Sequence, residues 1–301
     1  MLEYDFTFAE LAVKYLETED LDCLRKIIDL PATHHIMSHA KHFGNAASTS
    51  TTLEFVNQFF SPLDRQRKKL SVFKRNLCYA QEVVAKTRHA ETTALKYLPK
   101  DFRLTGKVFF TFGYDIGVVF GKNCSLNLAH PIFTNDLRQI LYYAIHEIHH
   151  IGFIAEKGGE MPSFSTLCTR GDMAKVIEYC THLEGMAVYA SLRLREDEGT
   201  TGLDNDYISL LSPHVIKEME KEYFNIYRYF KNRPNCPLSQ EDFKKINILS
   251  DEKRLWYIVG GYMAKIIDQS HGREKLITLI SESSENFISL YYRNKSIMFT
   301  L

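Results

Sequence analysis

The sequence of 301 residues predicts an α+β protein that is predominantly helical and carries a small sheet. Two observations predict this class. Apolar residues recur at helical spacing along most of the chain, and proline, glycine and polar clusters divide the pattern into segments. One region departs from the pattern, because residues 107–128 contain short aromatic and β-branched runs that favour strands.

The first hundred residues are expected to form an N-terminal helical region, residues 1–100. Residues 3–30 have the pattern of one or two amphipathic helices, which Pro31 ends. Residues 53–97 are expected to be helical again, with an interruption at Ser61-Pro62.

Four histidines lie between these helical segments: His34, His35, His39 and His42. The last three fall at positions i, i+4 and i+7, which share one face of a helix. That spacing is compatible with a second metal site, with a wall of a cleft, or with ordinary surface and core histidines. No carboxylate or cysteine is interleaved with them, which weighs against a dedicated metal site.

Three strands are expected in the middle of the chain. Residues 107–112 form the first, and residues 116–120 and 124–128 the other two. Gly121-Lys122-Asn123 separates the second strand from the third, as in a tight turn. A hairpin of the core is one interpretation of this pair of strands.

The rest of the chain is predicted to be helical, with loops between the helices. Thr134, Asn135 and Asp136 offer N-caps for the helix that follows them. A loop is expected after Gly152. Further helices are expected over residues 172–194, 213–230, 239–248, 252–268 and 272–292, and Gly260-Gly261 in the fourth of these suggests close helix packing or a bend.

The most informative stretch is residues 146–150, which read H-E-I-H-H and contain an H-E-x-x-H motif within a helical segment. Residues four apart lie one above the other on a helix, so His146 and His150 can present two imidazole nitrogens to one metal ion. Glu147 lies about 100° round the helix from His146. It is therefore beside the metal without binding it, where it can take a proton from a water molecule. His149 is off the ligand face and is expected to be a supporting or packing histidine.

Charge and composition exclude several other classes of function. Lysine plus arginine equals aspartate plus glutamate, 37 of each, so no basic excess points to nucleic acid or to an anionic membrane. The acidic N-terminus has no signal-peptide pattern, and no apolar run approaches the ~18 residues of a membrane span. The six cysteines are scattered without a C-x-x-C pair. We therefore expect a cytoplasmic protein with reduced thiols.

The H-E-x-H-H helix and residues 183–189, which read L-E-G-M-A-V-Y, together resemble the gluzincins. These are HExxH zinc metallopeptidases whose third zinc ligand is a glutamate. More closely, the chain resembles an uncharacterised family of zinc-dependent peptidases with an H-E-x-H-H helix and an E-G-x-A-x-Y helix. The resemblance covers about residues 107–190, and a weaker one covers residues 257–279.

The resemblance implies that Glu184 is the third ligand of one Zn²⁺ per chain, with Gly185 allowing two helices to approach the ion. Glu178, on the same helix, is either a supporting partner of a ligating histidine or an exposed charge. Glu156 is the rival third ligand, at the position where metzincins carry a histidine. The match to metzincins is poor, because the residue is not a histidine and the glycine stands at 152, one position early.

The resemblance also implies an activity, namely hydrolysis of a peptide or protein substrate by water that Glu147 activates. Gluzincins often take an oxyanion donor from the later part of the chain, and Tyr257 is the first candidate here. Tyr262 is the alternative, and His271 is a weaker one. Zincins place an edge strand before the motif helix, where residues 116–120 lie, and an extended peptide pairs with that strand.

A zincin-like core over residues 101–301, with a small sheet packed on the HExxH helix, is thus expected, either as a separate region or continuous with residues 1–100. Two other classes stay open. One is a catalytically inactive, metal-stabilised protein with a peptide-binding or regulatory role. Glu147 argues against it, because a purely structural metal site needs no general base. The other is a helical di-iron oxidoreductase, which needs Glu-x-x-His twice, whereas Glu178 and His182 are four apart. The oligomeric state stays open.

Overall fold

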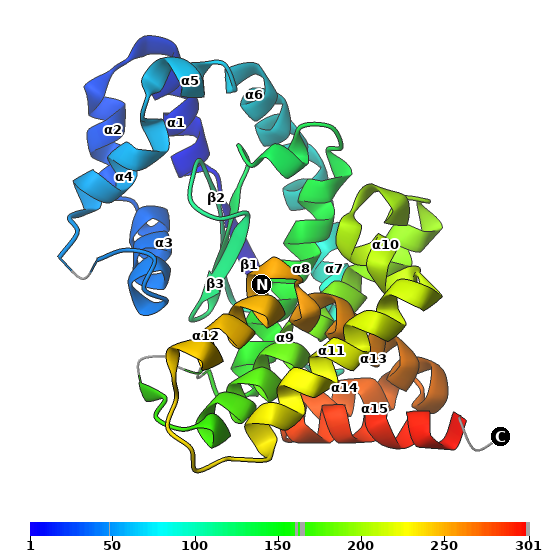
Figure 1. Cartoon of the computed structure of the whole chain (residues 1–301). Helices are drawn as coiled ribbons and strands as arrows, with labels where there is room; N and C mark the ends of the chain where they lie inside the picture. The colour runs from blue at the N-terminus through cyan, green and yellow to red at the C-terminus, as the bar shows by residue number, and fades with distance from the viewer. Residues whose placement is uncertain (48, 160–161, 163–165, 299–301) are drawn as a thin grey trace. The chain divides into compact units, whose positions relative to one another are not determined.

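The structure, a computed structural model, describes residues 1–47, 49–159, 162 and 166–298 (Figure 1). The chain divides into two compact units. Unit 1 comprises Met1–Ala94 and Phe102–Ala155, and unit 2 comprises Leu95–Asp101 and Glu156–Leu301. The predicted division into a helical region, residues 1–100, and a catalytic region, residues 101–301, stays a prediction.

Unit 1 contains a four-stranded sheet in the order β1-β2-β4-β3 (Figure 1). β2 is parallel to both β1 and β4, whereas β3 is antiparallel to β4 and lies at one edge. The three strands predicted between residues 107 and 128 are confirmed, and so is an α+β class dominated by helices. The zincin-like arrangement of the core stays a prediction. The strands are β1 (Leu2–Asp5), β2 (Gly106–Thr111), β3 (Gly117–Phe120) and β4 (Asn123–Asn127).

Strand β1 corrects the prediction that residues 3–30 are entirely helical. Its register pairs Leu2 with Gly106, which lies far along the chain. Four residues carry too little periodicity to separate a strand from the start of a helix. The first helix begins only after Asp5, whose side chain accepts a hydrogen bond from the Thr7 backbone N–H at 2.9 Å.

The helices of unit 1 otherwise follow the predicted pattern. Pro31 opens a helix as well as ending the one before it, since proline is tolerated in the first helical turn. The predicted interruption at Ser61-Pro62 separates two helices. The helices are α1 (Thr7–Thr18), α2 (Leu21–Ile28), α3 (Pro31–His42), α4 (Thr52–Phe60), α5 (Leu63–Arg67), α6 (Leu70–Tyr79), a π-helical turn (Ala80–Ala85), α7 (His89–Leu95) and α8 (Arg138–Glu156).

Helices α3 and α8 cover opposite faces of the sheet, and Figure 1 shows them on the two sides of the strands. The ring of His42 on α3 lies 5.5 Å from that of Phe120 on β3. Glu147 on α8 lies against Gly117 of the same strand. Side chains three residues apart on a strand point to opposite faces. The pleat of β3 therefore separates α3 from the motif helix.

The described part of unit 2 is helical, apart from an isolated bridge between Thr169 and Pro237. Its long first helix, α9, opens with a capping box in which Thr169 and Asp172 bond reciprocally. The helices are α9 (Arg170–Asp197), a 3₁₀ turn (Thr201–Leu203), α10 (Asn205–Leu211), α11 (Pro213–Lys231), α12 (Gln240–Asn247), a π-helical turn (Ile248–Glu252), α13 (Leu255–His271), α14 (Arg273–Ser281) and α15 (Ser284–Met298).

The predicted loop after Gly152 is wrong in its first residues. Helix α8 continues through Gly152 to Glu156, and the glycine is buried within it. Neighbours override the low helix propensity of glycine when a small side chain suits the packing. The part of the predicted loop at residues 160–161 and 163–165 lies outside the described residues.

Helices α9 and α13 cross in close contact at two glycines. A Cβ atom added to Gly185 would lie 2.3 Å from the carbonyl carbon of Gly260, and one added to Gly260 would lie 2.5 Å from the Thr181 carbonyl oxygen. The close packing predicted from Gly260-Gly261 is confirmed. The three atoms nearest to a Cβ at Gly185 belong to Gly260 of α13, and the further role of Gly185 in bringing the motif helix close stays a prediction.

Replacing Gly185 by alanine is expected to lower the free energy of unfolding by about 1–3 kcal/mol or more. The added methyl group meets backbone atoms, which cannot rotate away as a side chain can. The urea midpoint at an unchanged m-value measures the effect. Gly202→Ala is the matched control, since nothing lies within 4 Å of its added Cβ. Equal midpoints for the two variants would contradict the packing argument.

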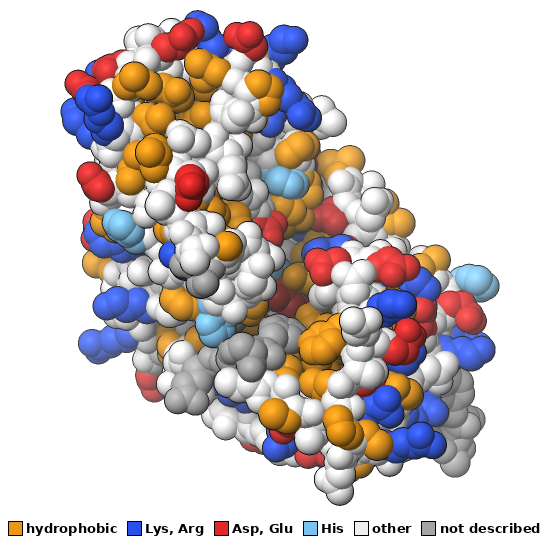
Figure 2. All heavy atoms as spheres, turned by 60° about the vertical axis from the view of Figure 1, so that its left-hand side comes forward, with side chains coloured by type: hydrophobic (Ala, Val, Ile, Leu, Met, Phe, Trp, Pro, Cys, Tyr) orange, Lys and Arg blue, Asp and Glu red, His pale blue; other side chains and the backbone are white. Residues whose placement is uncertain are grey.

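The surface carries both signs of charge. Basic and acidic side chains are interspersed over the face seen in Figure 2, in keeping with their equal numbers, 37 of each. Among the helices that the structure describes, none has an apolar stretch long enough to span a bilayer.

Candidate functional site

A single aspartate caps the start of the motif helix α8. Of the three predicted N-caps, Asp136 is the one that bonds the helix start, since its Oδ1 accepts the Arg138 backbone N–H at 3.1 Å. Its other oxygen accepts the Gln139 side-chain amide at 3.3 Å. A carboxylate at this end also interacts favourably with the helix dipole.

The two outer histidines of the motif lie together on one face of α8. The ring centroids of His146 and His150 are 4.4 Å apart, and the rings are nearly perpendicular at 82°. His150 is 5% exposed. His149, between them in sequence, is fully buried, with its ring 6.4 Å from that of Phe153. The helical period thus places His146 and His150 together on one face of α8, and His149 on another face, which is packed in the core.

Glu147 is buried against the edge strand of the sheet. Its side chain is so close that a Cβ added to Gly117 would lie 2.5 Å from Oε1 and 2.7 Å from the carboxyl carbon. Only glycine leaves room for the carboxylate here. Cys124 of β4 lies on the same face, where burial, with a smaller effect of the Glu147 charge, raises the pKa of its thiol. The general base predicted from the sequence therefore lies beside strand backbone.

The outer edge of β3 can be assigned from the ladder. The Asn127 N–H donates to the Ile116 carbonyl at 2.9 Å, so Ile116 and every second residue after it face β4. The backbone groups of Gly117 and Val119 consequently face the other way, along the edge of the sheet. Gly117 thus contacts the Glu147 side chain on one face of the sheet, while its own N–H and C=O point outward along the sheet edge.

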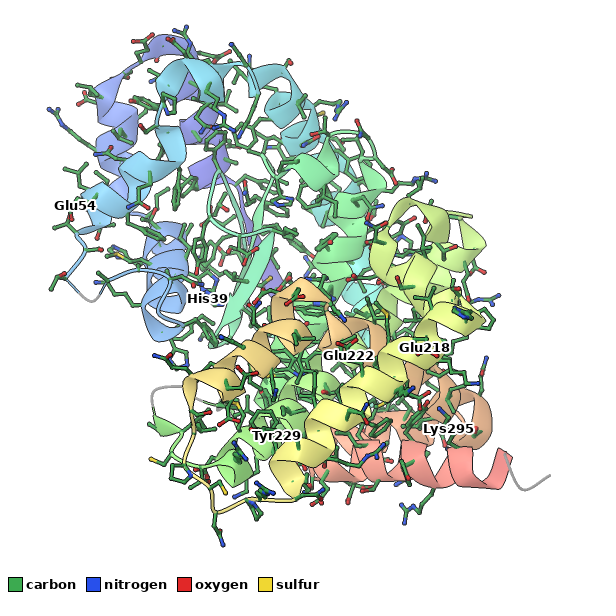
Figure 3. The ribbon with its side chains drawn as sticks, in the orientation of Figure 1. His39, Glu54, Glu218, Glu222, Tyr229 and Lys295 are labelled. Atoms are coloured by element: carbon green, nitrogen blue, oxygen red, sulfur yellow. The ribbon has the colours of Figure 1, made fainter. Side chains whose placement is uncertain are left out.

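The histidines of α3 have packing and cavity-lining positions. His34 and His35 line a cavity of about 610 Å³ between α3 and the sheet. The Nδ1 atom of His39, labelled in Figure 3, lies 3.0 Å from the Tyr114 hydroxyl. Burial lowers the pKa of both His35 and His39 to about 4, so each is neutral near pH 7. Among the described residues, no three of these histidines lie close enough to share an ion.

Glu184 lies on α9 in unit 2, where it is half-buried, next to the glycine that contacts α13. Two residues one turn before it lie within its electrostatic influence. Burial is the main cause that raises the pKa of the Tyr179 phenol and the Cys180 thiol, and the charge of Glu184 adds to it. No role was predicted for either residue. The spacing of four or five residues from Glu184 indicates that they are its neighbours on the helix.

Glu178 is not the exposed charge that was one of its two interpretations. It is 6% exposed and accepts hydrogen bonds from the Tyr227 hydroxyl at 2.6 Å and from the Lys231 ammonium at 2.9 Å. Both partners belong to α11. A buried carboxylate needs such partners to offset its desolvation. Glu178 therefore joins α9 to α11.

Glu156 is the last residue of α8. Its carboxylate accepts a hydrogen bond from the Ser281 hydroxyl at 2.6 Å. Because the helix is continuous from His150 to Glu156, the two residues are about 9 Å apart along its axis. They are also on different sides of the helix, so this geometry disfavours Glu156 as a ligand of the same ion.

The candidate oxyanion donors all lie on α13. His271 is the last residue of the helix, and its Nε2 atom lies 2.7 Å from the Asn294 Oδ1. Tyr257 and Tyr262 are both half-buried. The Tyr262 ring lies 6.2 Å from that of Tyr291, and burial raises the pKa of its phenol. The Tyr257 ring carries the Arg254 guanidinium at 3.8 Å from its centroid.

The fold and the motif together define a class of protein. The chain is a predominantly helical α+β protein whose H-E-x-x-H sequence lies on a helix covering a small mixed sheet. Its two histidines pair on one helix face, and its glutamate lies beside the edge strand.

The chain belongs to the family described as "Putative zinc dependent peptidase (DUF5700)", which matches residues 40–294. The matched part includes the whole motif helix, β2 to β4 and most of unit 2. No curated protein and no solved structure matches the chain. The family description connects the chain with zinc and with peptide hydrolysis.

Proposed function

We propose that the chain is a zinc-dependent peptidase in which His146, His150 and Glu184 hold one Zn²⁺ and Glu147 is the general base. The three ligands offer two imidazole nitrogens and one carboxylate oxygen. Catalytic zinc sites use this donor set and keep a fourth position open for water or substrate. The description of the family supports dependence on zinc and hydrolysis of peptides. A cytoplasmic location is part of the proposal.

Zinc, when bound, lowers the pKa of a water molecule toward ~7 and polarises a carbonyl oxygen. Glu147 accepts the proton of the attacking water and passes it to the leaving amine nitrogen. Tyr257 donates a hydrogen bond to the oxygen that becomes negative, with Tyr262 as the alternative donor.

One observation carries the proposal, namely that the Glu147 carboxylate lies against Gly117 of an edge strand. An extended peptide that pairs with the outward-facing groups of Gly117 and Val119 adds a strand to the sheet. Its backbone would then run past Glu147. The proposed substrate is therefore a peptide, or a protein segment, that can adopt an extended conformation.

Gly117→Ala is expected to lower kcat by more than about tenfold while zinc content stays unchanged. The added methyl group would lie 2.5 Å from Oε1 of Glu147, so the flexible carboxylate must move and the base is misplaced. Stability should change little, because the displaced atoms are the end of a side chain. Peptide hydrolysis, zinc content and urea midpoint are measured on one sample. Gly202→Ala is the control, and an unchanged kcat for Gly117→Ala would contradict the placement of the base.

The direct test of the function uses the metal-loaded protein and a library of fluorescence-quenched peptides, with product masses to locate the cleaved bond. We expect about one zinc per chain and cleavage that a chelator abolishes. Zinc without cleavage would favour the metal-stabilised peptide-binding alternative. Two irons per chain would favour the di-iron oxidoreductase.

A further inference from the structure

The start of helix α13 has an unusual backbone conformation. Arg254, the residue before the first helical residue Leu255, has φ 51° and ψ 39°, in the left-handed region. A side chain with a Cβ atom disfavours that region, and such residues persist where surrounding contacts fix them.

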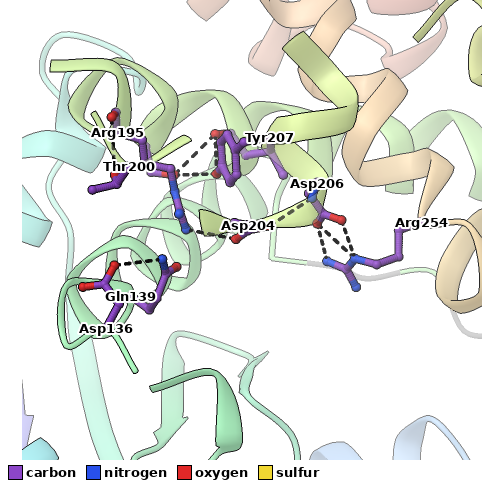
Figure 4. Close-up of polar contacts among 10 residues, drawn as sticks. Asp136, Gln139, Arg195, Thr200, Asp204, Asp206, Tyr207 and Arg254 are labelled. Atoms are coloured by element: carbon purple, nitrogen blue, oxygen red, sulfur yellow. Dashed lines mark hydrogen bonds and ion pairs between the residues drawn. The ribbon is translucent and has the colours of Figure 1, made fainter. Parts of the chain in front are cut away.

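An ion pair in unit 2 fixes Arg254. Figure 4 shows its guanidinium facing the carboxylate of Asp206, in the first turn of α10. The Nε atom donates to both carboxylate oxygens at 3.0 Å, and Nη2 lies 2.9 Å from Oδ2. The Asp206 side chain is only 13% exposed. Such a pair between a planar guanidinium and a carboxylate restrains both side chains in orientation as well as in distance.

The same guanidinium covers one face of Tyr257. The Arg254 Cζ atom lies 3.8 Å from the centroid of the tyrosine ring, well within the range of a cation–π interaction. The Tyr257 backbone N–H also donates to the Arg254 carbonyl at 3.1 Å. Asp206, Arg254 and Tyr257 therefore form a continuous chain of contacts, which we call the Arg254 stack.

Helix α13, which carries Tyr257, packs on the part of α9 that carries Glu184. Tyr257 is three residues, or about one helical turn, before Gly260. Gly260 contacts the backbone of Gly185, the residue that follows Glu184. The glycine crossing thus sets the first turn of α13 against this segment of α9 with little freedom to shift.

We propose that Arg254 is a positioning residue, which holds the phenol of Tyr257 in the orientation that hydrogen-bonds the developing oxyanion. The inference rests on the proposed function, and it adds a residue that the sequence did not indicate. Asp206 orients Arg254, and Arg254 orients Tyr257. An oxyanion donor is effective only when it is oriented before the reaction begins.

Arginine suits this role in a way that lysine does not. Its planar guanidinium can bond a carboxylate with one edge while it stacks on an aromatic ring with its face. A lysine ammonium at the same place is a point charge without a face. Arg254→Lys should therefore recover only part of the activity that Arg254→Met loses.

The kinetic test compares Arg254→Met, Tyr257→Phe and the double variant. Loss of an oxyanion donor costs about 10²–10³-fold in kcat, so we expect that loss for Tyr257→Phe. Arg254→Met should lower kcat by about tenfold or more, with KM nearly unchanged, and should add almost nothing in the Tyr257→Phe background. Emission of Trp256, the one tryptophan of the chain, verifies folding.

Lys253→Met is the matched control, because Lys253 is the neighbouring cation but pairs with Glu222 at 2.7 Å. Its kcat should equal that of the unmodified protein. Fully additive losses in the double variant, or an unchanged kcat for Tyr257→Phe, would overturn the role of Arg254 and leave the peptidase intact. An unmodified protein that binds zinc and cleaves no peptide would instead overturn the proposed function.

A second measurement does not depend on turnover. In ¹⁵N-labelled protein, the Nε–H of Arg254 should resonate upfield of the same group in Tyr257→Leu, because the Arg254 guanidinium lies over the tyrosine ring. The shift should disappear in Tyr257→Leu, and the signal should broaden in Asp206→Asn. An identical Nε–H resonance in the unmodified protein and in Tyr257→Leu would overturn the Arg254 stack itself.

Discussion

Glu147→Gln is expected to keep its zinc and lose about 10²–10⁴-fold in kcat, the usual contribution of a general base. Glutamine has nearly the same shape, so it fills the space against Gly117, but it cannot accept a proton. The proposed metal ligands His146 and His150 are unchanged by the substitution. Zinc analysis and peptide hydrolysis on the same sample separate loss of the base from loss of the metal.

Glu220→Gln is a matched control for this variant. Glu220 is another buried glutamate, 4% exposed, and it accepts a hydrogen bond from the Tyr291 hydroxyl at 2.9 Å. Its replacement should lower stability and leave kcat per folded molecule unchanged. If Glu147→Gln kept full activity, water activation by Glu147 would have to be abandoned.

Glu184→Ala is expected to lose zinc and all measurable hydrolysis. Removing a hydrogen-bonding partner of a ligand typically costs 10–100-fold in metal affinity, and removing a ligand itself should cost at least that much. Titration with a competing chelator measures the affinity, and metal analysis after gel filtration measures retention.

Glu156→Ala is the comparison that decides between the two candidate ligands. Glu156 ends α8 and bonds Ser281, so its replacement should keep zinc and most activity. The opposite result, with zinc retained in Glu184→Ala and lost in Glu156→Ala, would move the third ligand to Glu156. Loss of zinc in both variants would show that Glu184 is not the only carboxylate that the metal needs.

Local patterns in the sequence predicted much of the fold. The strands at residues 107–128 were visible because aromatic and β-branched residues cluster there. The pairing of His146 and His150 was visible because residues four apart lie one above the other on a helix. Long helices such as α9 were visible because apolar periodicity accumulates over many residues.

Features that depend on distant partners were missed or misread. Strand β1 exists because Leu2 pairs with Gly106, and nothing within four residues shows that. The contact of Gly185 with Gly260, 75 residues further along the chain, was not predicted. Glu178 had two open interpretations until Tyr227 and Lys231 were seen to bond it.

The sequence by itself determined that this protein carries an H-E-x-x-H helix with two histidines on one face. Helical geometry depends on spacing alone, so no other part of the chain is needed for that conclusion. Only the tertiary structure decided that Glu147 lies against an edge strand, and that Arg254 stacks on Tyr257. Burial and stacking depend on which segments meet in space, and packing interactions between residues far apart in the chain determine which ones do.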